Sequence, residues 1–303
     1  MRVLFIGQDG LFSTLPLRTI AAEHEIVGIV ESVPQKYTPV KANLKRMLAR
    51  RGKKTTLKYL AGQLSVPYFL LQRGVSNNLA AFVVKLSPDI ICVASMSQLL
   101  PKEVFSIPIY GAINFHPALL PKYRGPRPLF WPYYFMEPDV GVTIHYIDEG
   151  EDTGDIILQK KIPIPLGTPG GELVGEIINS GASLMAQALD EISKSTVNRI
   201  PQNHLPCPFR ARRYNDNEEL LDWNWPIERI WHFLRGTVYQ DKVFPRQFPG
   251  LTWMATKFIK CEENDTAGKF HWNLRECYIS HRKGKIYITP HWSPINFFRD
   301  LYH

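Results

Sequence analysis

Short apolar runs alternate with helical patterns in the first third of the chain, and this alternation constrains the fold most. The runs are rich in β-branched and aromatic residues, as strands are, and lie at Val3–Ile6, Ile26–Val30, Val66–Leu71 and Asp89–Ala94. Helical patterns fill the gaps, over about 13–23, 41–62 and 77–86. Strands that alternate with helices usually pair in parallel, so the sequence predicts a doubly wound, Rossmann-like and mostly parallel α/β sheet.

The pattern continues and then changes near residue 200. Further strands are predicted at Gly111–Phe115 and near 141–147 and 155–162, with helices over about 127–136 and 170–194. A Pro-rich stretch, 200–208, has the composition of a linker. One amphipathic helix from Ile227 to Leu234 and short strands near 252–261, 269–274, 276–281 and 285–289 follow. The sequence therefore predicts a domain over 1–205 and a smaller β-rich domain over 206–303.

The positive charge of the chain is concentrated in one segment. The formal net charge is +8, yet between Ser32 and Pro88 there are eleven Lys and Arg residues and no Asp or Glu. Nine of the eleven lie from Lys36 to Lys58. Such a run could bind phosphates, although it more often forms the solvated face of a helix.

Composition also indicates where the protein works. No apolar stretch approaches the length that spans a membrane, and the first residues have the pattern of a buried strand, not of a leader. The four cysteines are scattered without paired spacing, which argues against a zinc site or a disulfide framework. The sequence predicts a cytoplasmic protein with no membrane partner and no metal.

The stretch Asn114-Phe115-His116-Pro117 ends one predicted strand, and an acidic, Gly-containing turn follows a later one. Side chains alternate along a strand, so Asn114 and His116 share a face. The amide is a neutral donor, the imidazole accepts protons near neutral pH, and an aspartate of the turn could orient it. Two alternatives are polar groups that merely satisfy one another at a sheet end, and a calcium loop, whose ligand spacing the turn lacks.

The longer pattern resembles the formyltransferase family that uses 10-formyltetrahydrofolate, which includes methionyl-tRNA, glycinamide ribonucleotide and amino-sugar formyltransferases. The matching elements, in order, are Asn114–Gly125, Gly141–Ile144 and Asp148–Ile156. The resemblance runs from Met1 to about Ile164, and more faintly into the C-terminal third. There it implies a small barrel-like domain behind the catalytic one.

The resemblance implies an N-formyltransferase with 10-formyltetrahydrofolate as formyl donor and no metal. It implies Asn114 as an oxyanion donor, His116 as proton acceptor or further oxyanion partner, and Asp152 as the charge that sets the histidine and helps to shuttle the proton. Leu100 and Leu120 are expected to be ordinary core. The implied folate-binding residues are Ser95, Met96, Gln98, Leu99, Leu119, Pro121 and Asp148. The implied substrate-binding residues are Gly10, Phe12, Tyr123, Arg124 and Arg127.

The sequence leaves three alternatives for function. The favoured acceptor is a small phosphorylated amine, a nucleotide-linked amino sugar of surface polysaccharide synthesis. The loop Gly125-Pro126-Arg127-Pro128 departs from the pattern of the tRNA enzyme, and the basic segment is helix-like, not a Gly- and Pro-rich loop. The second alternative is methionyl-tRNA, which suits the basic charge. The third is a non-enzymatic nucleic-acid-binding module, although the basic run lacks interleaved aromatic residues. A homodimer is one option for the oligomeric state.

Overall fold

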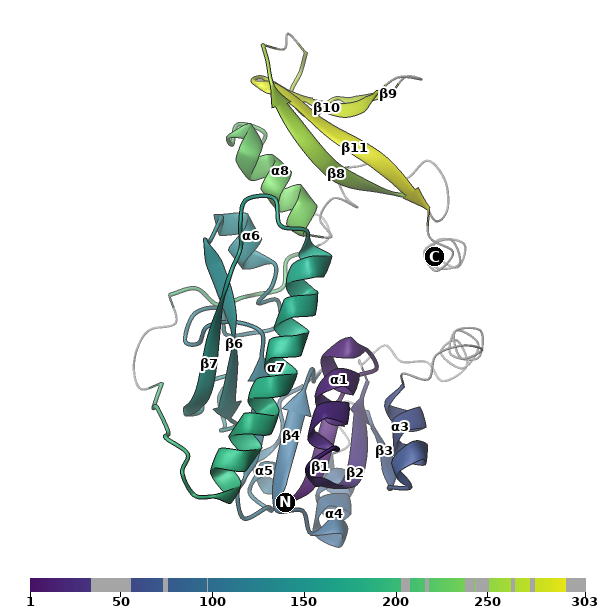
Figure 1. Ribbon diagram of the computed structural model, residues 1–303, viewed down its shortest axis with the longest axis vertical. Helices are drawn as coiled ribbons and strands as arrows, with labels where there is room; N and C mark the ends of the chain where they lie inside the picture. Colours follow the sequence, from purple (N-terminus) through teal and green to yellow (C-terminus); the bar gives the residue numbers. More distant parts are fainter. Residues whose placement is uncertain are drawn as a thin grey trace. The chain divides into compact units, whose positions relative to one another are not determined.

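Strands and helices alternate along the first two thirds of the chain in the computed structural model (Figure 1). The structure describes residues 1–33, 56–72, 76–96, 98–202, 208–215, 218–237, 243, 251–262, 265–272 and 276–292. The elements of this part are β1 (Arg2–Gly7), α1 (Leu11–Ile20), β2 (Glu25–Ser32), α3 (Leu57–Leu64), β3 (Tyr68–Leu71), α4 (Ser76–Leu86), β4 (Ile90–Ala94), α5 (Lys102–Phe105), β5 (Ala112–His116), α6 (Trp131–Phe135), β6 (Asp139–Tyr146), β7 (Ile156–Pro163) and α7 (Gly170–Ser193).

Seven of these strands form one sheet in the order β3-β2-β1-β4-β5-β6-β7. The neighbours from β3 to β5 pair in parallel, and β6 pairs antiparallel with β5. Strands β1 and β4 are buried along nearly their whole length, as strands with helices on both faces should be. The predicted doubly wound, mostly parallel sheet is therefore confirmed.

Helices pack on both faces of this sheet. Leu4 and Ile6 of β1 share one apolar cluster with Leu79 and Val83 of α4 and Val104 of α5. Other side chains of the sheet contact α1 and α7, which lie together in front of it in Figure 1. The sheet is thus the middle layer of three.

Gly181, in the middle of α7, lets that helix approach β5 closely. A methyl group at this position would lie 2.2 Å from a ring atom of Phe115. The same ring packs on Phe12 of α1, with ring centroids 5.8 Å apart. Because Phe115 lies between Asn114 and His116 in the sequence, these contacts fix where the two polar side chains leave the strand.

Most predicted elements are present with ends shifted by a few residues, and three differ more. The helix predicted over 127–136 is reduced to α6, because Pro126 and Pro128 disfavour helical backbone before it. The short helix α5 was not predicted. The helix predicted over 41–62 falls largely outside the described residues; α3 begins after Thr56, whose hydroxyl accepts a hydrogen bond from Tyr59 N–H.

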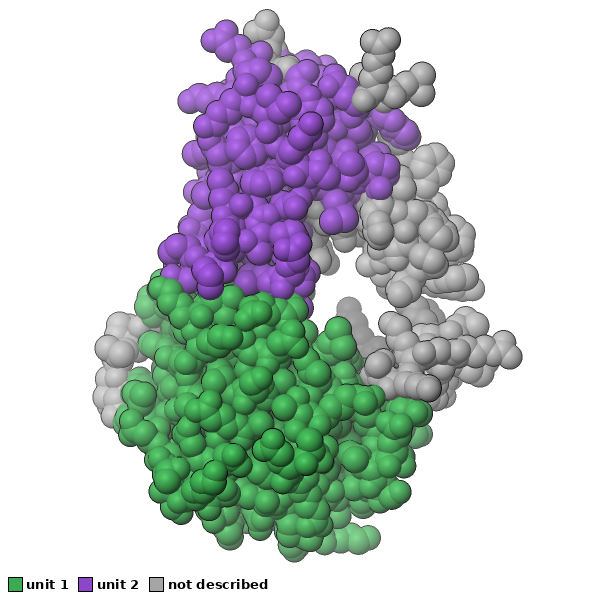
Figure 2. Space-filling view, viewed as in Figure 1, with its two compact units in different colours: residues 1–128, 140–162, 175–211 green, residues 129–139, 163–174, 212–303 purple. Residues whose placement is uncertain are grey.

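The chain divides into two compact units, each made of several segments (Figure 2). One comprises residues 1–128, 140–162 and 175–211, and the other 129–139, 163–174 and 212–303. The second contains α8 (Ile227–Gly236) and an antiparallel sheet in the order β8 (Leu251–Lys260), β11 (Gly284–Trp292), β10 (Cys277–His281), β9 (Phe270–Trp272). Trp231 of α8 packs on Phe258 of β8, with ring centroids 5.1 Å apart.

The predicted β-rich C-terminal region is confirmed. Ile227, Ile230 and Leu234 of α8 are buried, as their helical spacing indicates. The predicted boundary between 205 and 206 lies outside the described residues and stays a prediction. Cys207, most of the basic segment and the end of the aromatic tail also lie outside them. In the described part of the chain, no helix is both long and apolar enough to cross a membrane.

Replacing Gly181 by Ala should destabilise the protein, although Ala is the better helix former. The added methyl must displace Phe115, and overpacking of this kind costs about 1–3 kcal/mol. Gly175→Ala is the matched control in the same helix, because nothing lies within 4 Å of the methyl it adds. That variant should be as stable as the parent or gain up to about 1 kcal/mol. Chemical denaturation measures both; equal or greater stability of Gly181→Ala would contradict this packing account.

Candidate active site

The carboxyl end of β5 carries Asn114 and His116 on the face opposite Phe115. Strand β6 runs antiparallel beside it, with His145 opposite Asn114 and Thr143 opposite His116. Paired residues of neighbouring strands point to the same face, so β6 adds a second imidazole to the predicted pair. The shared face of Asn114 and His116 is confirmed.

Asp152 lies in the turn after β6, and its carboxylate lies close to Asn114, His116 and His145. Its Oδ2 accepts a hydrogen bond from Gly125 N–H at 2.9 Å and lies 3.5 Å from His116 Nδ1. Its Oδ1 lies 3.5 Å from Asn114 Nδ2 and 3.6 Å from His145 Nε2. Asp152 has a left-handed backbone (φ 55°), which aspartate tolerates better than most residues. The structure thus brings the three predicted catalytic residues together.

The hydrogen bonds of His116 assign roles to its two ring nitrogens. Nε2 lies 2.9 Å from the carbonyl oxygen of Tyr123. A carbonyl can only accept, so Nε2 carries a proton. When the ring is neutral, Nδ1 is therefore the free base, and it faces the carboxylate of Asp152. A proton received at Nδ1 would be stabilised at once by that charge.

His145 orients the amide of Asn114, and sequence reasoning missed it. Its Nδ1 lies 2.7 Å from Tyr146 O, so Nδ1 is the donor and Nε2 can accept. Asn114 Nδ2 lies 3.1 Å from Nε2 and donates to it. The second amide N–H points to Asp152 at 3.5 Å, beyond the usual range for a strong hydrogen bond. In the sequence, the one signal for His145 is an imidazole within an apolar run. Its role becomes visible only from the strand register, which pairs it with Asn114.

Burial and charge act in opposite directions on the pKa values of the site. Burial lowers the pKa of His116, although the carboxylate of Asp152 opposes this. Burial disfavours ionisation of Asp152, but the charge that His116 carries when it is protonated and the hydrogen bond from Gly125 N–H lower the pKa of its carboxyl below the ordinary range. The arrangement therefore provides an ionised carboxylate beside a neutral imidazole that can take up a proton.

The groups differ in their access to solvent. The side chain of Asp152 is 17% exposed, whereas those of His116 and His145 are 5% and 2% exposed. Asn114 is half-buried. An incoming molecule would therefore meet the amide and the carboxylate first, with the imidazoles behind them.

The predicted folate-binding segment follows β4, at the same edge of the sheet as the end of β5. Met96 packs against the apolar cluster below it, Gln98 is half-buried, and Leu99 is 61% exposed. Ser95 has a left-handed backbone (φ 65°) that turns the chain away from the strand. Met96 and Leu99 add apolar surface to this edge of the sheet, and their contact with folate stays a prediction. Leu100 is buried, as expected for core.

The second predicted folate-binding segment, Leu119–Pro121, is held by Thr143. The Thr143 hydroxyl donates to Ala118 O at 2.6 Å and accepts from Leu120 N–H at 3.2 Å. Gln159 Nε2 donates to Leu120 O and to the same hydroxyl, both at 2.9 Å. Leu119 and Pro121 are half-buried, whereas Leu120 is core as expected. Strand β6 therefore positions this segment as well as His145.

The predicted substrate-binding residues lie at the N-terminal end of α1 and in the loop after β5. Gly10 (φ 140°) precedes α1, and Phe12 packs on β5 as described above. Tyr123 is buried and contributes the carbonyl that binds His116. Arg124 hydrogen bonds to Gln202, and the main-chain N–H of Arg127, an exposed residue, donates to Ala211 O at 3.0 Å. Their contact with substrate stays a prediction.

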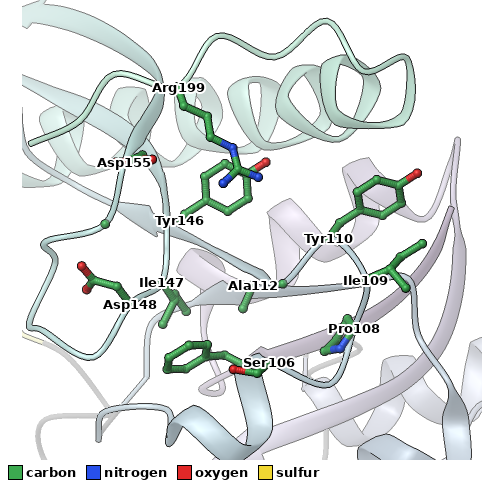
Figure 3. A pocket seen from close by; sticks show the side chains of 13 residues that line it. Ser106, Pro108, Ile109, Tyr110, Ala112, Tyr146, Ile147, Asp148, Asp155 and Arg199 are labelled. Carbon is green, nitrogen blue, oxygen red and sulfur yellow. The ribbon is translucent and has the colours of Figure 1, made fainter.

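A cavity of about 430 Å³ opens at the opposite end of β5 (Figure 3). Arg199 stacks on Tyr146 at its edge, with the guanidinium carbon 3.9 Å from the ring centroid. Asp148 also lines it, but its carboxylate accepts hydrogen bonds from Gly150 N–H and Thr153 Oγ. Asp148 thus stabilises its own turn, and its predicted contact with folate stays a prediction.

Known proteins are similar to this chain in sequence and in fold. Residues 1–189 match the family model described as formyl transferase. Methionyl-tRNA formyltransferase of Clostridioides difficile (strain 630) is 33% identical over 254 residues, which covers 80% of this chain and 78% of that protein. Methionyl-tRNA formyltransferase of Alkaliphilus oremlandii (strain OhILAs) is 29% identical over 282 residues, which covers 92% of this chain and 87% of that protein.

A solved structure extends the likeness to the whole fold. The N-formyltransferase from Helicobacter canadensis, in complex with folinic acid and dTDP-3-aminofucose, matches with a TM-score of 0.66. The match covers 96% of this chain and 100% of that one, at 19% sequence identity. At that identity the likeness shows the fold alone.

Replacing His116 by Ala or Asp152 by Asn should lower the turnover number about 100-fold or more, because each removes part of the proton-transfer pair. Binding of a folate analogue should be largely kept, and its effect on the melting temperature measures this binding. Asp155→Asn is the matched control, since it makes the same chemical change in the same turn without touching the cluster. Near-normal turnover of the His116 or Asp152 variant would remove that residue from the mechanism.

Proposed function

Since the chain belongs to the formyl transferase family, we propose that it transfers a formyl group to the amine of methionyl-tRNA. It is an N-formyltransferase, and the donor of the family is 10-formyltetrahydrofolate. The observation that carries the acceptor proposal is the similarity to methionyl-tRNA formyltransferases over most of the chain, 33% in the relative from Clostridioides difficile. The relatives thus favour the second of the two acceptors that the sequence leaves open.

The site offers a place for the donor and groups for the reaction. When bound, 10-formyltetrahydrofolate supplies the formyl group. Met96, Leu99 and Leu119 are the residues we propose to hold its ring system, since they combine apolar surface with the edge of the sheet that carries Asn114. The reacting carbonyl would then lie beside the half-buried amide.

Asn114 is the proposed oxyanion donor. One of its N–H groups is engaged by His145, whereas the other makes only a long contact with Asp152. The second N–H can therefore turn to an oxygen that gains charge as the amine attacks. A donor of this kind is worth about 100- to 1000-fold in turnover.

His116 and Asp152 are the proposed proton-transfer pair. Asp152 is the more accessible of the two, and His116 is the stronger base. The proton lost by the attacking amine would therefore pass to the pair and reside on His116 Nδ1, stabilised by the carboxylate. The pair then returns it to the nitrogen that leaves the formyl carbon.

The charge of the chain supports a polyanionic acceptor, whereas one loop supports a smaller one. The basic run from Lys36 to Lys58 could neutralise several phosphates of a tRNA. The loop Gly125-Pro126-Arg127-Pro128 places a guanidinium between two prolines, which suits bidentate contact with one diphosphate. A nucleotide-linked amino sugar is therefore the second candidate acceptor.

Salt dependence of turnover separates the two acceptors. Methionyl-tRNA and a panel of nucleotide-linked amino sugars would be tested with 10-formyltetrahydrofolate, with release of tetrahydrofolate followed by absorbance. For a tRNA held by six or more phosphates, kcat/KM should fall about 1000-fold or more between 50 and 200 mM salt. Efficient turnover of an amino sugar, with a shallow salt dependence and no formylation of methionyl-tRNA, would overturn the proposal.

Charge-neutralising variants sharpen this test. Changing Arg50 and Arg51 to Gln should weaken formylation of methionyl-tRNA, since both lie in the basic run. Lys85→Gln with Lys194→Gln removes the same charge from exposed positions on α4 and after α7, and is the control. If the acceptor is a sugar nucleotide, the Arg50/Arg51 variant should be unaffected and Arg127→Ala should raise KM.

A further inference from the structure

The residues after α7 run back along the site instead of leaving it. Ile200 pairs with Ile156 through two main-chain hydrogen bonds of 2.8 and 2.9 Å. Phe209 O accepts from Tyr123 N–H, and Ala211 exchanges hydrogen bonds with Arg124 and Arg127. The described residues 200–202 and 208–211, here called the return segment, are thus tied to the turn region after β6 and to the 123–127 loop. Their composition alone predicts a linker.

Gln202 is a buried polar side chain of this return segment, and all of its hydrogen-bonding capacity is used. Its Nε2 donates to the main-chain oxygens of Asp152 at 3.0 Å and Gly154 at 2.7 Å. Its Oε1 accepts from Arg124 Nε at 3.1 Å and Nη2 at 2.7 Å. A primary amide has two N–H donors and two acceptor sites, so these four contacts fix its orientation completely.

These contacts hold the carboxylate of Asp152 from two sides. Gln202 binds the main chain of Asp152 itself, where the backbone is left-handed. It also binds the side chain of Arg124. Arg124 directly precedes Gly125, and the N–H of Gly125 donates to Asp152 Oδ2. The separation of Asp152 from His116 Nδ1 therefore depends on one amide that touches neither side chain.

A second link between the return segment and the turn is weaker. Arg210 forms a bidentate ion pair with Glu151, at 2.6 and 2.9 Å. The two side chains are 54% and 34% exposed, and ion pairs in contact with solvent contribute little to stability. Gln202, which is 5% exposed, is the stronger tie.

We propose that Gln202 is a positioning residue for formyl transfer: it keeps the Asp152 turn and the 123–127 loop in the register that places the carboxylate against His116. The proposal rests on the catalytic role of Asp152 given above. Gln202 acts on turnover through Asp152, without contact with donor or acceptor.

A double-mutant cycle on turnover tests this. Gln202→Ala should lower kcat about 10- to 100-fold, as a displaced catalytic group does, with little change in the KM for 10-formyltetrahydrofolate. In the Asp152→Asn background the same change should lower kcat less than about 2-fold, because residues that act as a unit are not additive. The assay uses 10-formyltetrahydrofolate and whichever acceptor, methionyl-tRNA or amino sugar, the protein turns over.

Two further variants serve as a second test and as a control. Gln202→Glu keeps the volume and the contact with Arg124 but loses both N–H donors. It should therefore lower kcat as much as Gln202→Ala does, and it provides a second test if Gln202→Ala folds poorly. Gln187→Ala, at an exposed position of α7, should leave kcat unchanged.

The outcomes separate the inference from the proposed site. If Asp152→Asn leaves kcat unchanged, the catalytic role of Asp152 is wrong. If Asp152→Asn is slow and the Gln202 change multiplies its loss, Gln202 acts elsewhere and the inference is overturned. Unchanged kcat with a lowered melting temperature in Gln202→Ala would reduce Gln202 to a structural residue and overturn it equally.

Discussion

The buried carboxylate of Asp152 is the interaction on which the rest of the site depends. A carboxylate removed from water is costly unless it is hydrogen-bonded and faces groups of complementary charge or polarity. Here the partners come from three places: His116 and Asn114 from β5, His145 from β6, and Gly125 from the loop after β5. These groups surround the carboxylate only when the strands pair in the observed register. The acid–base chemistry of the site therefore depends on the geometry of the sheet.

The same burial gives the histidine its chemical character. His116 lies behind Asp152, with Nε2 engaged by a main-chain carbonyl and Nδ1 directed at the carboxylate. Burial favours the neutral ring, so Nδ1 is available as a base before an amine arrives. Once a proton reaches it, the carboxylate compensates the new charge. The pair can thus hold a proton transiently without an exposed histidine, which suits transfer between two nitrogens at one carbon.

Much of this could be predicted from the sequence, because it depends on local patterns. Alternation along β5 places Asn114 and His116 together, and the helix–strand alternation predicts the sheet that presents them. His145 could not be found in this way, since its role depends on the antiparallel pairing of β6 with β5. Gln202 was hidden for a related reason. It lies in a Pro-rich stretch typical of a linker, and its three partner residues are distant in sequence. The interleaving of two units along the chain is likewise a tertiary property that composition does not reveal.

The proposed proton transfer requires a neutral His116 that is protonated at Nε2 beside an ionised Asp152. Ring-nitrogen NMR of ¹⁵N-histidine-labelled protein measures this protonation state directly. We expect His116 to titrate below the ordinary histidine pKa of 6.5, with the neutral ring carrying its proton on Nε2. In Asp152→Asn the titration should move to still lower pH, because the carboxylate that favours the imidazolium is gone. A His116 that titrates above 6.5, or a neutral ring with its proton on Nδ1, would contradict the central claim.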